Sequence, residues 1–241
     1  TPGSRRVPVG GGRTPPPSTG APDGGRLTPR FAATRCNELA AGEDPAPVLA
    51  AMARRLEGAG AEALAMPCNT AHHYAPAIRA AVSVPLIDMV ALSVTHAAAL
   101  AGPGGTVGIL ASPAVRRIGL FDRAFANAGL TPVYPQDDAA MLAAIRLIKA
   151  QGAKPAARSA LAGASAELAA RGARVQMIAC TEFSLISEAV DPEVQAFDTL
   201  DLLVEGILAF AITDSPDRTK PEMTTRSANA PQSHPNKESL Q

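Results

Sequence analysis

Two cysteines in near-identical surroundings are the residues of this chain best suited to chemistry. Cys68 follows the apolar run 63–67, Cys180 follows the apolar run 175–179, and a short polar group comes directly after each thiol. Upstream, both halves contain Leu-x-x-x-Gly-Ala, then six residues, then the cysteine. This recurrence predicts two copies of one helix–turn–strand unit, each presenting a thiol at the C-terminal end of its strand. Two such thiols can face each other across a shared cleft and move a proton on and off one carbon from opposite sides.

The neighbours of both thiols favour an acid–base role. A cysteine where a strand ends and a helix begins lies among unpaired backbone N–H groups at the positive end of a helix dipole, which favours the thiolate. Asn69 and Thr70 follow the first cysteine, and Thr181 and Glu182 follow the second. The threonine hydroxyls could donate hydrogen bonds to a bound carboxylate. Open α/β sheets bind ligands at the carboxyl ends of their strands, where both groups are predicted.

A purely structural interpretation must be weighed for each cysteine. Cysteine is among the most buried residue types and is usually inert packing. Two cysteines at equivalent strand ends, each followed by polar residues, favour function instead. Cys36 lacks this context, so we expect it to be structural.

The elements that would position the thiols alternate along the chain. Strands are predicted over about 63–67, 84–89, 106–111, 131–134, 175–179 and 195–198, and helices over about 45–58, 74–81, 90–100, 115–128, 138–151, 154–171, 182–188 and 200–212. Strands that alternate with helices predict parallel sheet with helices on both faces.

The chain divides into two predicted lobes between two unusual ends. Residues 1–29 are rich in proline and glycine and the segment 214–241 is polar and interrupted by proline, so both are predicted to be disordered. Glycines at 102–105 mark a boundary between lobes. We expect a first lobe of residues 30–101 plus 198–213 and a second lobe of residues 102–197.

Composition narrows the range of partners. The 22 basic and 22 acidic residues give no net charge, so nothing steers the chain toward nucleic acid or an anionic membrane. No apolar run approaches the roughly 20 residues that span a bilayer. Three cysteines do not make a disulfide framework and no signal-peptide pattern is present, so we expect a cytoplasmic protein.

The two cysteine segments resemble a known family. Met-Pro-Cys-Asn-Thr-Ala-His at 66–72 and Ala-Cys-Thr-Glu at 179–182 resemble the paired signatures of the aspartate/glutamate racemase family, in particular its aspartate racemase branch. The resemblance covers about residues 28–212. It implies an α/β fold of two flavodoxin-like lobes related by pseudo-twofold symmetry, and an isomerase that needs no cofactor. It also implies that one cysteine, as thiolate, removes the α-proton while the other, as thiol, protonates the opposite face.

The resemblance extends to further candidate site residues. Lys149 lies in a segment like one whose lysine is near the substrate, so it is either a carboxylate clamp or a solvated helix lysine. Arg30 or Arg35 would grip the side-chain carboxylate of the substrate, for which a planar guanidinium is suited. His72 would orient the thiol. Ser112 would either contact the substrate or cap a helix.

The chain departs from the family at its beginning. A strand and a Gly-Gly-Met-Gly-Pro loop with which the family opens are not found in residues 1–29, so we expect an incomplete first lobe and weak or absent activity. Alternatives are a related cysteine-dependent isomerase or decarboxylase, or an inactive remnant. The expected substrate is a dicarboxylic amino acid, aspartate before glutamate, although one methylene is worth only about 1–3 kcal/mol in a pocket. An alanine-rich helix face could support a homodimer.

Overall fold

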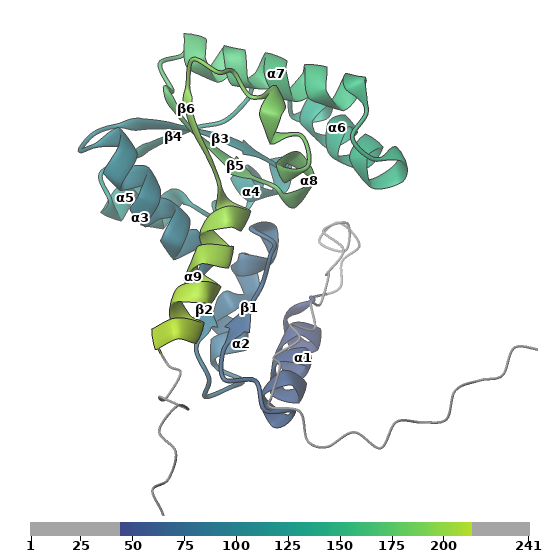
Figure 1. Cartoon of the computed structure of the whole chain (residues 1–241), viewed down its shortest axis with the longest axis vertical. Helices are drawn as coiled ribbons and strands as arrows, with labels where there is room; N and C mark the ends of the chain where they lie inside the picture. Colours follow the sequence, from purple (N-terminus) through teal and green to yellow (C-terminus); the bar gives the residue numbers. More distant parts are fainter. Residues whose placement is uncertain (1–43, 214–241) are drawn as a thin grey trace, which may run out of the picture.

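Helices and strands alternate along the chain in the computed structural model, which describes residues 44–213 (Figure 1). The predicted disordered ends, 1–29 and 214–241, lie outside these residues, as does Cys36. The elements in order are α1 (Ala46–Gly58), β1 (Leu64–Ala65), η2 (Thr70–Tyr74), α2 (Ala75–Arg79), β2 (Leu86–Ile87), α3 (Met89–Ala101), β3 (Thr106–Ala111), α4 (Pro113–Arg117), α5 (Asp122–Asn127), β4 (Thr131–Val133), α6 (Asp138–Gln151), α7 (Pro155–Ala170), β5 (Val175–Ala179), α8 (Thr181–Ser184), η3 (Ser187–Ala189), β6 (Gln195–Asp198) and α9 (Thr199–Thr213).

The strands form two parallel sheets. The larger sheet has the strand order β4-β3-β5-β6, and in the smaller sheet β1 pairs with β2. The strands are parallel because each helical connection returns the chain to the end of the sheet at which the previous strand began. The predicted α/β fold with parallel sheets is therefore confirmed. The residue boundaries of the two lobes stay a prediction.

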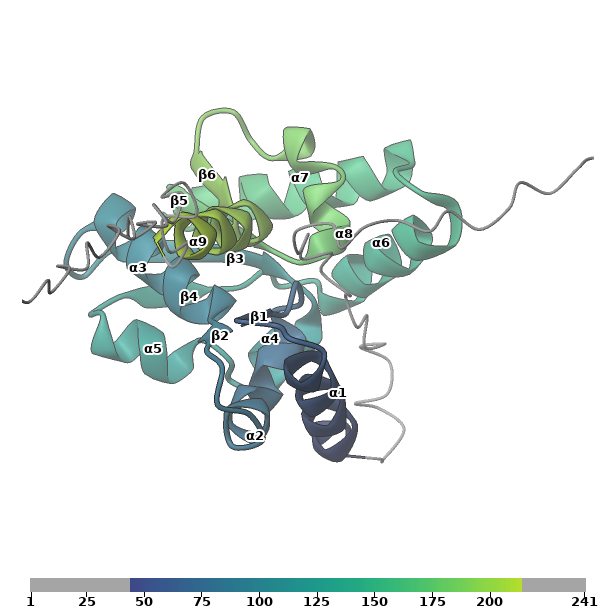
Figure 2. The same cartoon turned by 60° about the horizontal axis from the view of Figure 1, so that its bottom comes forward.

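Helices cover both faces of the larger sheet (Figure 2). Ile109 and Met177 belong to the apolar core shared with α3 and α5, whereas Leu110 and Ile178 belong to the core shared with α6 and α7. Strands β3 and β5 are buried almost throughout, as central strands of a parallel sheet should be. This packing gives the carboxyl ends of β3 and β5 a rigid support.

The repeat predicted from the sequence has the same local structure in both copies. Two residues after the end of α1 and of α7 comes a glycine in the left-handed region, Gly60 with φ 90° and Gly172 with φ 87°. In each copy the alanine after the glycine donates its N–H to the carbonyl of the leucine five residues earlier, over 3.0 Å. This is the Schellman arrangement that glycine favours at a helix end. Each turn then leads into the strand that ends near Cys68 or Cys180.

Two predicted helices are wrong in extent. The helix predicted over 115–128 is interrupted, because Gly119 adopts φ 60° and ends α4 before α5 begins. The helix predicted over 182–188 is also shorter, since α8 stops at Ser184 and only the short η3 follows. The two interruptions follow β3 and β5, where the chain leaves a strand and turns back over a face of the larger sheet.

Helix α9 connects the two sheets. It starts directly after β6 of the larger sheet and packs against α3 and β2 (Figure 1). Gly206 allows the close approach, because a Cβ atom there would lie 2.7 Å from Leu92 Cδ1 and 3.2 Å from Ile87 Cγ2. The first residue of α9 is therefore anchored to one sheet while the helix body lies against the other.

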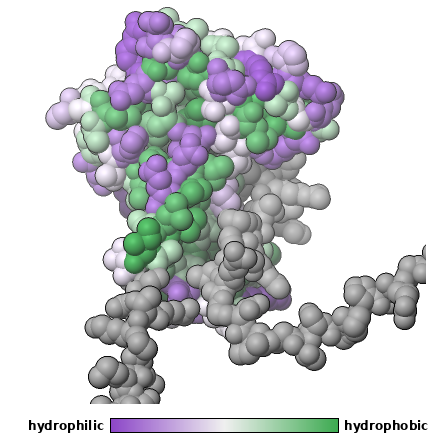
Figure 3. All heavy atoms as spheres, in the orientation of Figure 1, coloured by the Kyte–Doolittle hydropathy of each residue, from purple (hydrophilic) through white to green (hydrophobic). Residues whose placement is uncertain are grey.

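The outer face of α9 is apolar. Val204, Leu208 and Ile212 are exposed at helical spacing, and a hydrophobic stripe follows the helix on the surface (Figure 3). None of the helices between residues 44 and 213 combines the length and the apolar character that crossing a membrane requires.

Candidate active site

The two predicted catalytic cysteines lie where strands give way to helical turns. Cys180 directly follows β5 and occupies the N-cap position of α8. Cys68 lies three residues beyond β1 and two residues before η2. Both cysteines are partly buried. The structure thus places each thiol at the carboxyl end of a parallel strand, where α/β folds bind their ligands.

A buried chain of two hydrogen bonds joins the cysteine segments. The side-chain amide of Asn69 donates from Nδ2 to Thr199 Oγ1 over 2.9 Å, and the Thr199 hydroxyl donates to the carbonyl of Ile178 over 3.0 Å. Asn69 and Thr199 are only 2% and 1% exposed. Asn69 adjoins Cys68, and Ile178 lies two residues before Cys180, so this bridge brings the surroundings of both thiols together.

Sequence reasoning missed Thr199. The signal that could have found it is the one used for the cysteines, a polar residue directly after a strand, since Thr199 follows β6. What could not be found is its partner, because Asn69 lies 130 positions away in the chain.

Asn69 also carries an unused acceptor. Its Oδ1 atom is buried and accepts no hydrogen bond from any residue in the range 44–213. Leaving such an atom unsatisfied costs about 1–3 kcal/mol, and an exception of this kind in a folded protein calls for a physical explanation. The residue next to Cys68 therefore carries a buried acceptor for which the described residues supply no donor.

Cys180 is paired with a carboxylate. Its thiol donates to Glu182 Oε2 over 3.0 Å, and Lys149 Nζ lies 3.2 Å from Glu182 Oε1. Burial raises the pKa of Glu182, but the hydrogen bond from Cys180 and the charge of Lys149 outweigh it, so the pKa lies below the ordinary value. Glu182 is consequently ionised at neutral pH, and in this arrangement the sulfur of Cys180 carries the proton.

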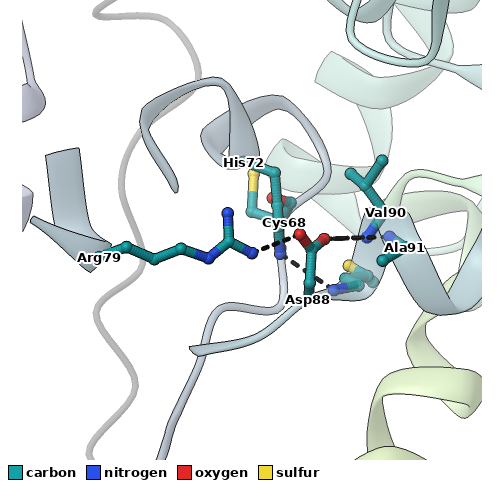
Figure 4. Close-up of polar contacts among 7 residues, drawn as sticks. Cys68, His72, Arg79, Asp88, Val90 and Ala91 are labelled. Carbon is teal, nitrogen blue, oxygen red and sulfur yellow. Dashed lines mark hydrogen bonds and ion pairs between the residues drawn. The ribbon is translucent and has the colours of Figure 1, made fainter. Parts of the chain in front are cut away.

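His72 supports the backbone at the other cysteine (Figure 4). Its Nδ1 atom lies 2.9 Å from the carbonyl oxygen of Cys68, and Met89 donates its N–H to Nε2 over 3.2 Å. Since Nε2 accepts, Nδ1 must carry the hydrogen and donate it. Burial lowers the pKa of His72, and the Cys68 carbonyl and the charge of Asp88 offset this only in part. His72 is thus a neutral side chain that holds the Cys68 carbonyl.

Asp88 fixes the element behind His72. Its Oδ1 atom caps α3 by accepting the N–H groups of Val90 and Ala91, and its Oδ2 atom pairs with Arg79 (Figure 4). Burial raises the pKa of Asp88, but the hydrogen bonds from Ala91 and Arg79 together lower it by more. The pKa of Asp88 therefore lies below its ordinary value. The α3 N-terminus, and with it the Met89 N–H that His72 accepts, is held in place.

The remaining predicted site residues differ in where the structure places them. Ser112 caps α4 at the carboxyl end of β3, accepting an N–H over 3.4 Å. Thr70 is buried, and the hydroxyl of Thr181 lies 3.5 Å from the oxygen of Glu182 that also accepts from the thiol. Arg30 and Arg35 lie outside the described residues. The part of the chain from 44 to 213 places no three His, Cys, Asp or Glu side chains where they could hold a metal ion.

An open hollow of about 580 Å³ lies at the other end of the larger sheet, near the starts of its strands. It is lined by Leu100, Ala101, Thr106, Gly172, Arg174, Val175, Glu193 and Gln195. These residues lie where β3, β5 and β6 begin, whereas Cys180 follows the end of β5. The hollow is therefore separate from the cysteine site.

Comparison with known proteins identifies the family. The model of the Asp/Glu/Hydantoin racemase family matches residues 25–207 of the chain. The chain belongs to this family. Racemases are isomerases. The family resemblance noted at the two cysteine segments is confirmed over residues 25–207.

Solved structures agree with this assignment in their fold. A candidate Asp/Glu racemase from Yersinia pestis has 24% identity and a TM-score of 0.60, covering 69% of this chain and 74% of its own. An aspartate racemase from Picrophilus torridus has 20% identity and a TM-score of 0.57, covering 70% and 71%. An aspartate racemase homologue from Pyrococcus horikoshii OT3 has 22% identity and a TM-score of 0.56, covering 69% and 74%. The predicted two-lobe α/β architecture is thereby supported.

The buried, neutral state of His72 predicts a pH dependence of stability. Its pKa in the folded protein lies below that of the unfolded chain, about 6.5, so the unfolded state takes up the proton first as the pH falls. The free energy of unfolding should be full above about pH 6.5 and decline below it, by at most about 1.4 kcal/mol per pH unit. Urea unfolding between pH 5 and pH 7.5 measures this, and H72Q should show a flatter profile.

The matched control is the exposed neighbour His73. H73Q should keep the wild-type decline. If the profile of H72Q has the same slope as that of the wild type, His72 is not the group whose protonation destabilises the fold.

Proposed function

We propose that this protein is a cofactor-independent racemase of a small dicarboxylic amino acid, with Cys68 and Cys180 as opposed acid and base. The observation that carries the proposal is the buried bridge from Asn69 through Thr199 to Ile178. It ties the segment of one thiol to the strand of the other. Membership in the racemase family supports the reaction type.

The reaction would need two proton transfers on opposite faces of the α-carbon. One cysteine, as thiolate, takes the α-proton, and the electron pair of the broken C–H bond delocalises into the α-carboxylate. The other cysteine, as thiol, gives its proton to the opposite face of the planar carbanion. The first sulfur ends as thiol and the second as thiolate, which is the state required for the reverse reaction. A positioned acid or base of this kind contributes about 10²–10⁴-fold to the rate.

Glu182 would serve as the proton partner of Cys180. The thiol already donates to this carboxylate, so as Cys180 removes the α-proton its own proton can pass to Glu182 and from there to solvent, and when Cys180 acts as acid Glu182 accepts the hydrogen bond of the thiol. Lys149 favours the ionised carboxylate through its charge. At the other cysteine, His72 holds the backbone carbonyl of Cys68. Glu182 thus contacts a thiol and His72 a backbone carbonyl, although the backbone units of the two cysteines repeat.

The substrate would be held by groups that surround the thiols. Asn69 Oδ1 is suited to accept a hydrogen bond from the α-ammonium group, which would satisfy the buried oxygen. The hydroxyls of Thr70 and Thr181 can donate to the α-carboxylate. Lys149, Ser112 and either Arg30 or Arg35 remain the candidates for the side-chain carboxylate. Aspartate is proposed before glutamate because the cysteine segments resemble the aspartate racemase branch. The fold does not separate the two, since aspartate and glutamate racemases both have it.

Replacement of either cysteine tests the proposal. The wild-type protein in D₂O should invert L-aspartate or L-glutamate and incorporate deuterium at Cα, at the weak rate expected from its atypical N-terminal segment. C68S and C180S should each lose inversion by about 10³-fold, because a serine hydroxyl is a poor acid–base group at neutral pH. Chiral chromatography with mass spectrometry measures both quantities, and C36S should behave as wild type.

Other outcomes would point to the alternatives. A reaction that depends on one cysteine alone would indicate a related isomerase or decarboxylase. A wild-type protein that incorporates no deuterium from either amino acid would indicate an inactive remnant.

The Glu182 partnership predicts an asymmetric effect. E182Q keeps the size of the side chain but cannot take the Cys180 proton, so deuterium wash-in should fall by about 10²-fold for the enantiomer whose α-proton Cys180 removes. Wash-in from the other enantiomer should fall much less. Initial exchange rates from each pure enantiomer, followed by NMR, measure this.

E188Q is the matched control for that variant. Glu188 forms an exposed ion pair with Arg158 in the same part of the fold and should leave both exchange rates unchanged. Equal losses from both enantiomers in E182Q would remove Glu182 from its proposed role.

A further inference from the structure

We infer that Thr199 is a positioning residue that fixes the Cys68 segment relative to the strand carrying Cys180. The inference rests on the proposed two-thiol reaction and adds a residue that acts on the positions of the two cysteine segments. Thr199 acts through its two hydrogen-bond partners, Asn69 next to Cys68 and Ile178 two residues before Cys180.

The hydroxyl of Thr199 is used in both of its capacities. It accepts from the Asn69 amide over 2.9 Å and donates to the Ile178 carbonyl over 3.0 Å. A threonine hydroxyl has one hydrogen to donate, and the Ile178 carbonyl receives it, so the Asn69 amide must point its N–H toward the oxygen. The orientation of the Asn69 side chain is therefore set, and its Oδ1 atom is left for another donor.

The backbone of Thr199 is fixed independently of this bridge. Strand β6 pairs with β5, with Asp198 opposite Ile178, and Thr199 is the next residue. Asp198 caps α9 by accepting the N–H of Leu200 over 2.8 Å. Because the larger sheet and the helix cap hold Thr199 from both sides, it is the Cys68 segment that its hydroxyl restrains.

The two-thiol reaction makes this restraint visible in its products. Inversion requires the second sulfur to reach the carbanion, whereas exchange with retention requires only the first sulfur. Suppose that Cys180 has removed the α-proton and the Cys68 segment has shifted away. The Cys180 thiol then exchanges its hydrogen with solvent and reprotonates the carbanion on the same face. A displacement of about 1 Å can cost about 10²-fold in rate. Loss of the bridge should therefore raise retention relative to inversion.

The variant T199V tests the inference because valine keeps the shape of threonine and removes both hydrogen bonds. In D₂O, starting from the enantiomer whose α-proton Cys180 removes, the ratio of deuterated product with retained configuration to inverted product should rise at least about tenfold. T199S keeps a hydroxyl and should restore the wild-type ratio. T213V is the matched control, since Thr213 on the same helix donates to the carbonyl of Ala209 over 2.8 Å at an exposed position.

A merely structural role gives a different result. A destabilised T199V would contain less folded protein, which lowers exchange and inversion equally and leaves their ratio at the wild-type value. That outcome would overturn the inference. If T199V does not fold, T199A is measured in the same way, and failure of both to fold while T199S folds would also overturn it. A wild-type protein without exchange or inversion would instead overturn the proposed function and this inference with it.

Discussion

The site depends on a polar chain of three groups in an apolar interior, the amide of Asn69, the hydroxyl of Thr199 and the carbonyl of Ile178. Each of these hydrogen bonds adds only about 1 kcal/mol to stability, but a broken one would leave buried polar atoms without partners. That penalty makes one arrangement of the chain much better than its neighbours. The bridge therefore holds the segment after β1 in one position and orientation relative to the end of β5. Proton transfer to one carbon by two thiols needs such a fixed arrangement.

A repeated backbone unit carries two different chemical environments. Helix α1 and helix α7 end in the same glycine turn, and each leads into a strand and a cysteine. The side chains behind the cysteines differ. The thiol of Cys180 donates a hydrogen bond to Glu182, which forms an ion pair with Lys149, whereas a neutral His72 holds the carbonyl of Cys68. A reaction that treats the two faces of one carbon in opposite ways can use such a difference.

Much of the fold and the positions of both cysteines could be predicted from local sequence patterns. The spacing from leucine through glycine to cysteine predicted the repeat, and the bounds of β3 and α6 matched the prediction because apolar periodicity and flanking turn residues agree there. The interruption at Gly119 was missed because the residues around it have helical periodicity, and one left-handed glycine overrides it. Lys149 was expected near a substrate carboxylate, and the structure pairs it with Glu182. Contacts of this kind join residues far apart in the chain, and a single sequence does not record them.

The central claim is that one bound amino acid lies between both thiols, and ligand protection tests it most directly. A protein carrying C36S would be treated with iodoacetamide at increasing concentrations of whichever of L-aspartate or L-glutamate is turned over. Peptide mass spectrometry then gives the alkylation of each remaining cysteine. The account predicts that Cys68 and Cys180 are protected together, with the same half-saturating concentration. Protection of only one thiol, or of the two at clearly different concentrations, would contradict it.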